Sequence, residues 1–294
     1  MQRLFYFCAV NPSYITEKSL SDFISAALLE DVGPGDYSTL ASVPADAQNR
    51  ARLLIKDAGV LAGVEMALHI FRQVDPRLQV KVLLEDGSPV KKGDIGLEVN
   101  GNARSILTAE RLVLNCMQRM SGVATITQRM VKLIEGTGAK LLDTRKTTPN
   151  FRIAEKWAVV IGGGYNHRYG LYDMVMLKDN HTDFAGGIRQ AIESTNKFLA
   201  EKSLSLKIEV ETRSLQEVEE VLSVGGIHRI MLDNMTPEVM RQAVQLINKQ
   251  YETEASGGIT EGSIRAVAES GVDYISVGAL THSAQPLDIS LKAF

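Results

Sequence analysis

The chain has 294 residues, 45% hydrophobic and 23% charged, which is ordinary for a globular protein and long enough for one barrel or two domains. Its formal net charge of -3, without a basic run, argues against a nucleic-acid partner. No apolar stretch approaches the ~20 residues that cross a bilayer, and Cys8 and Cys116 form no metal or disulfide pattern, which favours a reduced, cytoplasmic setting.

The first domain is predicted over residues 1–120. Its opening run, 1–10, is apolar but short and has no small-residue cleavage site, so we interpret it as a mature N-terminus. A helix is predicted over Ser19–Glu30, and the Gly- and Pro-rich segment 30–39 that follows is predicted to be a loop. Strands at 50–56, 79–84 and 95–99, a helix at 64–74 and a turn at 89–94 then predict a mixed sheet with helices on one side, an α/β sandwich.

The second domain is predicted over residues 121–280. A long helical pattern from Ile106 to about Ile134, interrupted near Ser121–Gly122, leads into it. From Ala139 a short strand, a polar tip and a helix repeat, which predicts a parallel sheet and an incomplete, open α/β barrel. The predicted strands are 140–142, 174–177, 206–210, 229–232, 251–255 and 274–277. The predicted helices are 151–160, 184–199, 215–222, 237–248 and 261–269.

Each predicted strand of the second domain ends in charged, amide, hydroxyl or glycine residues. In α/β barrels the active site lies at this carboxyl end of the strands. One Asp or Asn there is often only a helix cap or a turn former, but six such ends favour a functional site. They are Asp143–Lys146, Lys178–Asn180, Glu211, Asp233–Asn234, Ser256–Gly258 and Gly278–Ala279.

Cations concentrate between Asp143 and His181. Arginine binds carboxylate or phosphate through two parallel hydrogen bonds, and lysine acts as a point charge. Solvated surface charges are the alternative interpretation, but neighbouring glycines and strands favour a concave anion site. The cations are Arg145, Lys146, His167, Arg168 and Lys178.

Carboxylates and glycines end the later strands. Glu211 and Asp233 follow successive strands, so they can hold magnesium or stabilise a developing positive charge, or they can be ion-pair partners of the cations. Ser256–Gly258 and Gly278 fit the phosphate position of barrels. Gly162–Gly164 follows a helical pattern and lacks the GxGxxG spacing, which argues against a dinucleotide loop.

Eight motifs, in order and over nearly the whole chain, resemble those of the quinolinate phosphoribosyltransferase family. They are LLEDVGPGDYST (28–39), LTAERLVLNCMQRMSGVAT (107–125), DTRKTTP (143–149), GGGYNHRYGLYDMVMLKDNH (162–181), EVE (209–211), IMLDN (230–234), EASGGI (254–259) and DYISVGALTHS (273–283). The resemblance implies an α/β sandwich followed by an open α/β barrel, with the tail 281–294 returning to the first domain. It also implies a homodimer whose active sites are shared between subunits.

The resemblance further implies a reaction. Phosphoribosyl pyrophosphate and quinolinate would give nicotinate mononucleotide, pyrophosphate and carbon dioxide in NAD biosynthesis, with magnesium. The resemblance also implies a role for each site residue. The quinolinate carboxylates would be bound by Arg145, His167, Arg168 and Lys178, with Arg111 from the partner subunit. The catalytic residues would be Lys146, between quinolinate and pyrophosphate, and Glu211 and Asp233, which would bind the ribose hydroxyls and magnesium. The 5-phosphate would be bound by Ser256, Gly257, Gly258 and Gly278.

Three alternatives remain open. A nicotinate or nicotinamide phosphoribosyltransferase of the same fold binds one carboxylate or none and needs fewer cations. A Schiff-base lyase on a barrel would use Lys178 or Lys146 as its nucleophile. A third alternative is a non-catalytic anion-binding module, in which Glu211 and Asp233 would reduce anion affinity unless a metal or a developing cation required them. For His181 and His282, a direct role and simple packing are both open.

One position departs from the family pattern. Asn150 stands where the family has glycine. Asparagine accepts a positive φ more readily than most residues, so only the local loop shape is affected.

Overall fold

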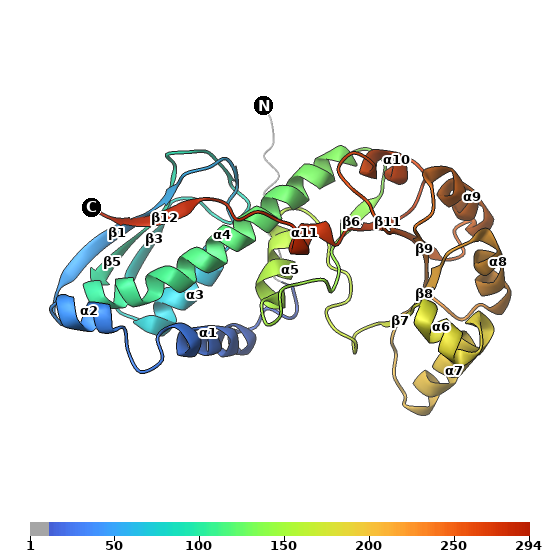
Figure 1. The fold of residues 1–294 in the computed structure, drawn as a ribbon, viewed down its shortest axis with the longest axis horizontal. Helices are drawn as coiled ribbons and strands as arrows, with labels where there is room; N and C mark the ends of the chain where they lie inside the picture. Colours follow the sequence, from blue (N-terminus) through green and yellow to red (C-terminus); the bar gives the residue numbers. More distant parts are fainter. Residues whose placement is uncertain (1–11) are drawn as a thin grey trace. The chain divides into compact units, whose positions relative to one another are not determined.

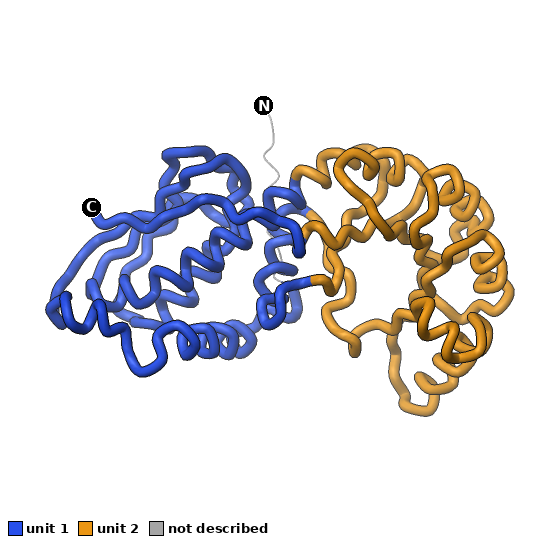
Figure 2. The backbone as a smooth tube through the Cα atoms, viewed as in Figure 1, with its two compact units in different colours: residues 1–128, 147–163, 281–294 blue, residues 129–146, 164–280 orange. Residues whose placement is uncertain are grey.

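The computed structural model describes residues 12–294, and the chain divides into two compact units (Figure 2). Unit 1 comprises Met1–Gln128, Thr147–Gly163 and Thr281–Phe294, and unit 2 comprises Arg129–Lys146 and Gly164–Leu280. The interpretation of residues 1–10 as a mature N-terminus therefore lies outside the described residues.

Unit 1 contains an antiparallel sheet of strand order β12-β1-β5-β3 and a small β2-β4 pair. Its strands are β1 (Gln48–Ile55), β2 (Gly59–Val60), β3 (Gln79–Val82), β4 (Pro89–Val90), β5 (Ile95–Asn102) and β12 (Ile289–Ala293). The tail supplies β12, which pairs with β1 from Ala293 opposite Ala51 to Ile289 opposite Ile55. The predicted mixed sheet is wrong, because every strand pair described in this unit is antiparallel.

Among the described residues, five helices of unit 1 accompany this sheet, and side chains cap the first two of them. They are α1 (Glu17–Asp31), α2 (Tyr37–Ser42), α3 (Val64–Val74), α5 (Arg152–Ile161) and most of α4 (Ala103–Leu133). Thr16 accepts the Ser19 N–H at the start of α1, which buries Leu20 and Ile24. Asp36 accepts the Thr39 N–H and starts α2, so the segment predicted as a loop ends in a helix.

Helix α4 runs without a break from Ala103 to Leu133, so the interruption predicted near Ser121–Gly122 is wrong. These small residues serve close packing instead. A Cβ on Gly122 would clash with the backbone oxygen of Gln285, in the returning tail. Ser121 Oγ accepts the Ala62 N–H at 2.9 Å. The boundary predicted at residue 120 lies inside this helix.

Unit 2 is built on a parallel sheet of order β6-β11-β10-β9-β8-β7. Its strands are β6 (Lys140–Leu142), β7 (Val175–Leu177), β8 (Ile208–Thr212), β9 (Arg229–Asp233), β10 (Glu252–Ser256) and β11 (Tyr274–Ser276). The edge strands β6 and β7 follow one another in the chain but do not pair, so the described sheet is open between them. This agrees with the predicted open α/β arrangement.

Helices lie along the outside of this curved sheet (Figure 1). They are α6 (Asp179–Ala185), α7 (Ile188–Glu201), α8 (Leu215–Val224), α9 (Pro237–Ile247) and α10 (Ile264–Ala268), and α11 (Ala279–His282) leads into the tail. The single helix predicted over 184–199 is wrong at its start. Gly186 and Gly187, at φ +91° and +134°, separate α6 from α7, because a right-handed helix does not continue through such conformations.

In the part of the chain that the structure describes, we find no helix that combines the length and the apolar character of a membrane span.

Candidate functional site

Charged residues alternate along one face of the parallel sheet in unit 2. Side chains two residues apart in a strand point to the same face, so Glu209 and Glu211 share a face of β8. Register continues this face across the sheet: Glu209 is opposite Arg229, which is opposite Glu252, and Asp233 is opposite Ser256. Parallel sheets that are covered on both sides normally carry apolar side chains on both faces. The charged side chains on this face therefore indicate a functional site.

At the carboxyl end of that face, acidic and basic side chains converge. Burial, followed by the negative charge of Asp233, raises the pKa of Glu211, and the positive charge of Lys178 opposes this rise. The three side chains therefore interact electrostatically, as their positions after successive strands predict. Asp233 also accepts a hydrogen bond of 2.6 Å from the Asn234 side chain. Glu211 is half-buried and Lys178 is exposed.

The next strand end is a glycine turn. Gly257 has φ +95° and Gly258 has φ +61°, conformations that favour glycine. A Cβ on Gly257 would lie 2.6 Å from Asn234 Cγ, whereas one on Gly258 would meet no atom within 4 Å. The Asn234 N–H donates to Ser256 O at 2.9 Å, which joins this turn to the end of β9. Gly278 follows β11 and precedes α11.

The chain from Tyr165 to Met174, the crossing segment, passes from one edge of the sheet to the other. Tyr165 donates its N–H to Leu141 O at 2.8 Å and forms a bridge with Leu142 in β6, whereas β7 begins directly after Met174. The buried Asp143 at the end of β6 accepts hydrogen bonds from the His167 N–H at 2.8 Å and from the Asn166 side chain at 2.6 Å.

The crossing segment brings two predicted cations together. Burial and the nearby positive charge of Arg145 hold the pKa of Arg168 below its ordinary value. Arg168 also donates to Met174 O at 3.1 Å. Lys146, three residues beyond Asp143, is exposed.

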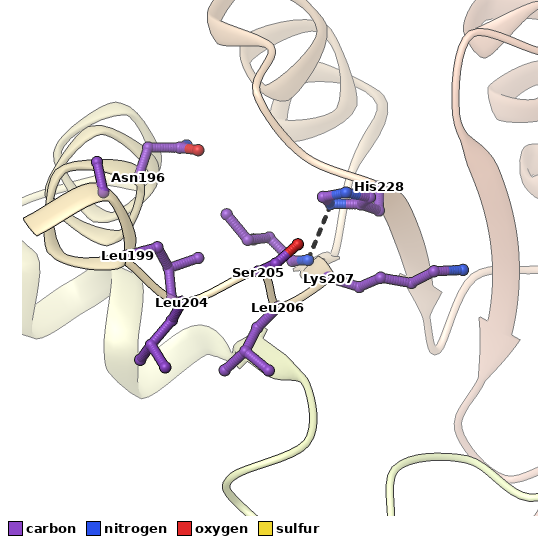
Figure 3. Close-up of a pocket in the computed structure, with 9 residues that line it drawn as sticks. Asn196, Leu199, Leu204, Ser205, Leu206, Lys207 and His228 are labelled. Carbon is purple, nitrogen blue, oxygen red and sulfur yellow. Dashed lines mark hydrogen bonds between the residues drawn. The ribbon is translucent and has the colours of Figure 1, made fainter. Parts of the chain in front are cut away.

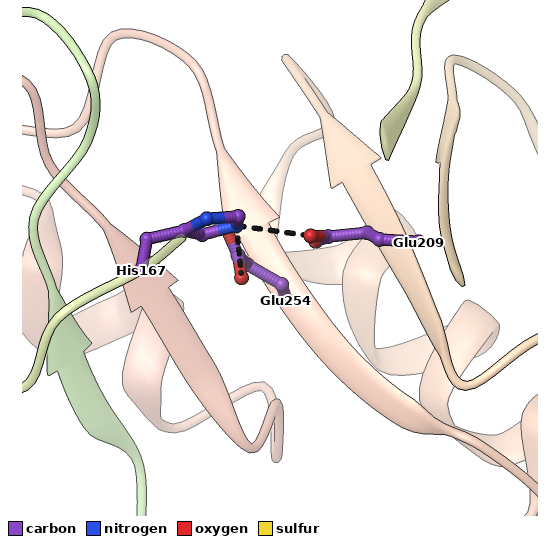
Figure 4. Close-up of side chains that lie close together, drawn as sticks. All are labelled: His167, Glu209 and Glu254. Carbon is purple, nitrogen blue, oxygen red and sulfur yellow. Dashed lines mark hydrogen bonds and ion pairs between the residues drawn. The ribbon is translucent and has the colours of Figure 1, made fainter. Parts of the chain in front are cut away.

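His167 lies deeper than the other predicted site residues, with 8% of its surface exposed, and it contacts two buried carboxylates (Figure 4). Its Nε2 lies 2.9 Å from Glu209 Oε2 and 3.5 Å from Glu254 Oε2. Burial alone would lower the pKa of His167, but its hydrogen bonds to Glu209 and Glu254 raise it to about 9. The Arg168 N–H donates to Nδ1 at 2.7 Å, which favours a neutral ring. A neutral ring that accepts a hydrogen bond at Nδ1 carries its proton on Nε2, and a charged ring carries a proton on both nitrogens. Nε2 is therefore protonated in either state.

Arg229 completes this buried cluster. It donates to Glu254 at 2.7 Å and to Glu252 at 3.0 Å, and its guanidinium stacks 4.0 Å from the centre of the Tyr274 ring. Burial raises the pKa of Glu209. Burial would raise that of Glu254 too, but the hydrogen bond with His167 and the charge of Arg229 hold it below its ordinary value.

The cluster was missed as a site by the sequence analysis. Glu209 and Glu254 were treated only as parts of motifs. The signal that could have found them is the alternation of charge inside the buried strands IEVET and ETEAS. The pairing of His167 with these carboxylates could not be predicted, because Glu209 and Glu254 lie 42 and 87 positions away from it in the sequence.

Three further residues have simpler surroundings. Arg111 lies exposed on α4, within unit 1. His181 Nδ1 accepts the Lys178 N–H at 3.0 Å, at the start of α6. His282 Nδ1 lies 2.7 Å from the Ser283 hydroxyl on an exposed surface. The geometry thus gives His181 a local structural task.

A hollow of ≈ 570 Å³ lies at the opposite end of the strands (Figure 3). It is bordered by the last turns of α7, by Lys207 before β8 and by His228 before β9. The Ile208 N–H donates to His228 Nδ1 at 3.0 Å. Since Glu211, Asp233 and Ser256 lie at the other end of these strands, this hollow is separate from the predicted site.

Two family models match this chain, one for each of its two parts. Residues 36–121 match the family model "Quinolinate phosphoribosyl transferase, N-terminal domain", and residues 123–292 match the corresponding C-terminal domain. A rice protein named "Nicotinate-nucleotide pyrophosphorylase [carboxylating], chloroplastic" is 48% identical, over 96% of this chain and 78% of that protein. A Nicotiana tabacum relative, "Quinolinate phosphoribosyltransferase [decarboxylating] 2b, mitochondrial", is 45% identical, over 96% and 83%.

Solved structures agree in fold. That of NadC from Streptococcus pyogenes has a TM-score of 0.88 and 41% identity, covering 95% of this chain and 97% of that chain. Human nicotinic acid phosphoribosyltransferase has a TM-score of 0.62 at 13% identity, covering 92% and 73%, which is a likeness of fold alone.

Proposed function

Because the chain belongs to the quinolinate phosphoribosyltransferase family, we propose that it transfers phosphoribosyl from phosphoribosyl pyrophosphate to quinolinate. The products are nicotinate mononucleotide, pyrophosphate and carbon dioxide, in the de novo synthesis of NAD. The observation that carries the proposal is that Arg145 and Arg168 interact electrostatically within unit 2, whose parallel strands also end in Glu211, Asp233 and a glycine turn. Two arginines that repel each other favour a ligand with more than one negative charge.

Quinolinate is such a ligand, since it carries adjacent carboxylates on a pyridine ring. Arg145, Arg168 and Lys178 would hold these carboxylates. His167 belongs to the same set, although both of its ring nitrogens have protein neighbours. Lys146 is exposed beside them and would serve between quinolinate and the departing pyrophosphate.

Glu211 and Asp233 would act at the ribose. Their mutual repulsion and the partial burial of Glu211 make them suited to a cation, either bound or developing. Carboxylate oxygens are the donors that magnesium prefers, so these two residues would hold it. When bound, magnesium neutralises the pyrophosphate. The His167 cluster fits magnesium less well, because it offers a nitrogen and because Arg229 already neutralises Glu254.

The glycine turn would receive the 5-phosphate. Ser256, Gly257, Gly258 and Gly278 follow neighbouring strands. Gly258 leaves open space where a side chain would otherwise project, so a phosphate oxygen could approach the backbone N–H groups.

Chemistry then proceeds at two atoms of quinolinate. The ring nitrogen attacks the anomeric carbon as the bond to pyrophosphate breaks, and the positive charge that develops on the ribose is stabilised by Glu211 and Asp233. Once the nitrogen carries the ribosyl group, the cationic ring accepts the electron pair released when the carboxylate at C2 leaves as carbon dioxide. A proton takes its place, so no separate decarboxylating residue is required.

A homodimer would complete the site, with Arg111 supplied by the partner subunit. Among the exposed large apolar side chains described in unit 2, the three most exposed are Leu171 at 69%, Tyr172 at 72% and Phe184 at 90%. Covering them with a second copy would remove apolar surface from water. A cytoplasmic location remains part of the proposal, although the rice and tobacco relatives are named as chloroplastic and mitochondrial.

Incubation with quinolinate and with nicotinate separately, each with phosphoribosyl pyrophosphate and magnesium, tests the proposal. We expect carbon dioxide to be released only in the incubation that contains quinolinate. Turnover of nicotinate without carbon dioxide would instead support the related phosphoribosyltransferase. Trapping of a carbonyl substrate on Lys178 or Lys146 by borohydride would support a Schiff-base lyase.

A further inference from the structure

The buried carboxylates Glu209 and Glu254 lie directly beneath the predicted site. Glu209 precedes Glu211 by two residues in β8, and Glu254 precedes Ser256 by two in β10, so each shares a sheet face with a residue of the proposed site. Both are fully buried, and the Oε1 atom of each has no hydrogen-bond partner within residues 12–294. Burying two carboxylates is costly unless positive groups accompany them.

Two basic groups face these carboxylates. Arg229, in β9 between them, pairs with Glu254 at 2.7 Å. His167 reaches them from the crossing segment, with Nε2 2.9 Å from Glu209. His167, Glu209 and Glu254 each offer one atom of a kind that binds metal ions, and these atoms all lie within 4.8 Å of one another. However, Nε2 forms a hydrogen bond with Glu209, and Glu254 is already paired with Arg229. These contacts favour a proton on Nε2 rather than a metal ion.

The other nitrogen of the His167 ring contacts the backbone of Arg168. Nδ1 accepts the backbone N–H of Arg168 at 2.7 Å, and the backbone N–H of His167 donates to Asp143 at 2.8 Å. The ring therefore links the sheet interior to the backbone of Arg168. A carboxylate that holds the proton on one imidazole nitrogen also fixes the ring orientation and the tautomer.

We propose that Glu209 and Glu254 are positioning residues, which keep the Nε2 of His167 protonated and thereby hold Arg168 in place for an anionic ligand. The identity of that ligand, quinolinate, rests on the proposed function. The protonation of His167 does not, and it can be measured without any activity.

Nuclear magnetic resonance of the full chain, labelled with ¹⁵N-histidine, provides that measurement. The chain has five histidines, and the His167→Gln variant identifies the signal. We expect Nε2 to be protonated at pH 7.5. Glu209→Gln and Glu254→Gln each remove a negative charge beside the His167 ring. Each substitution should therefore lower the titration midpoint of His167, the pH at which half of its rings are charged, by more than one pH unit.

Glu252→Gln is the matched control. Glu252 lies in β10 on the same face as Glu254, but its side chain pairs with Arg229, Lys207 and Tyr274. Its substitution should leave the midpoint of His167 within a few tenths of a pH unit. If Glu209→Gln fails to fold, the Glu254→Gln variant and the wild-type proton position still decide the matter.

Quinolinate binding, measured by calorimetry, tests the second half of the proposal. Glu209→Gln should weaken it roughly ten-fold and leave the affinity for phosphoribosyl pyrophosphate unchanged, which a general loss of structure would not do.

A wild-type proton on Nδ1 alone, an unchanged midpoint in both glutamine variants, or an Nε2–H signal that appears only after metal chelation would overturn the proposal. If the midpoint falls but quinolinate affinity does not, the positioning role is wrong. If the wild-type protein binds no quinolinate, the proposed function is wrong, and the histidine titration alone decides the role of the two carboxylates.

Discussion

Substituting Glu155 by alanine should destabilise unit 1 strongly. Glu155 is fully buried in α5 and accepts three hydrogen bonds of 2.9 Å, one from Arg119 Nε and two from Thr148, and its carboxylate also forms an ion pair with Arg119 Nη2 at 2.9 Å. Arg119 also donates to the backbone oxygens of Thr281 and Ala284 in the tail. The substitution leaves a largely buried guanidinium without its carboxylate, which costs about 3–5 kcal/mol.

The single tryptophan of the chain makes this loss measurable. Trp157 lies two residues from Glu155 in the same helix and is 2% exposed, so its fluorescence follows unfolding of unit 1. With a urea dependence of ~2 kcal/mol per molar, the unfolding midpoint should fall by roughly 2 M. Asp22→Ala is the control, because the Lys18–Asp22 pair has a similar 2.7 Å contact but side chains 84% and 64% exposed. Such pairs contribute little. Equal shifts for the two variants would refute the reasoning.

Three changes test the proposed site. Gly257→Ala forces a Cβ against Asn234 at φ +95°, a strain of ~1–3 kcal/mol, so the KM for phosphoribosyl pyrophosphate should rise about ten-fold in steady-state assays; an unchanged KM would exclude a phosphate role for this turn. Glu211→Ala should lower kcat roughly 10²–10³-fold with quinolinate affinity retained, and a loss of affinity alone would argue against its role at the ribose. Arg111→Ala and Lys178→Ala should each be inactive, but after subunit exchange their mixture should recover about a quarter of wild-type activity. No recovery, despite demonstrated exchange, would count against a shared site.

Much of the fold follows from local pattern. Every strand of the parallel sheet lies within two residues of its prediction, because short apolar runs alternate with helical periodicity and polar ends. Asn150 has φ 61°, a positive value that asparagine accepts more readily than most residues, as expected from the sequence.

The predictions that were wrong concern features that depend on turn geometry or on contacts between residues distant in sequence. Gly122 resembles a helix breaker, but its missing side chain accommodates Gln285, 163 residues further along the chain. Gly186 and Gly187 divide two helices that a periodic pattern merges. The strand ends could be predicted as polar, whereas the buried partners of His167 could not, because strand register rather than local sequence brings Glu209 and Glu254 together.

The most direct test is a product assay of the purified full chain with quinolinate, phosphoribosyl pyrophosphate and magnesium. We predict one carbon dioxide and one pyrophosphate released for each nicotinate mononucleotide formed, and no turnover when nicotinate replaces quinolinate. Nicotinate mononucleotide formed from nicotinate without carbon dioxide, with quinolinate left unreacted, would contradict the account.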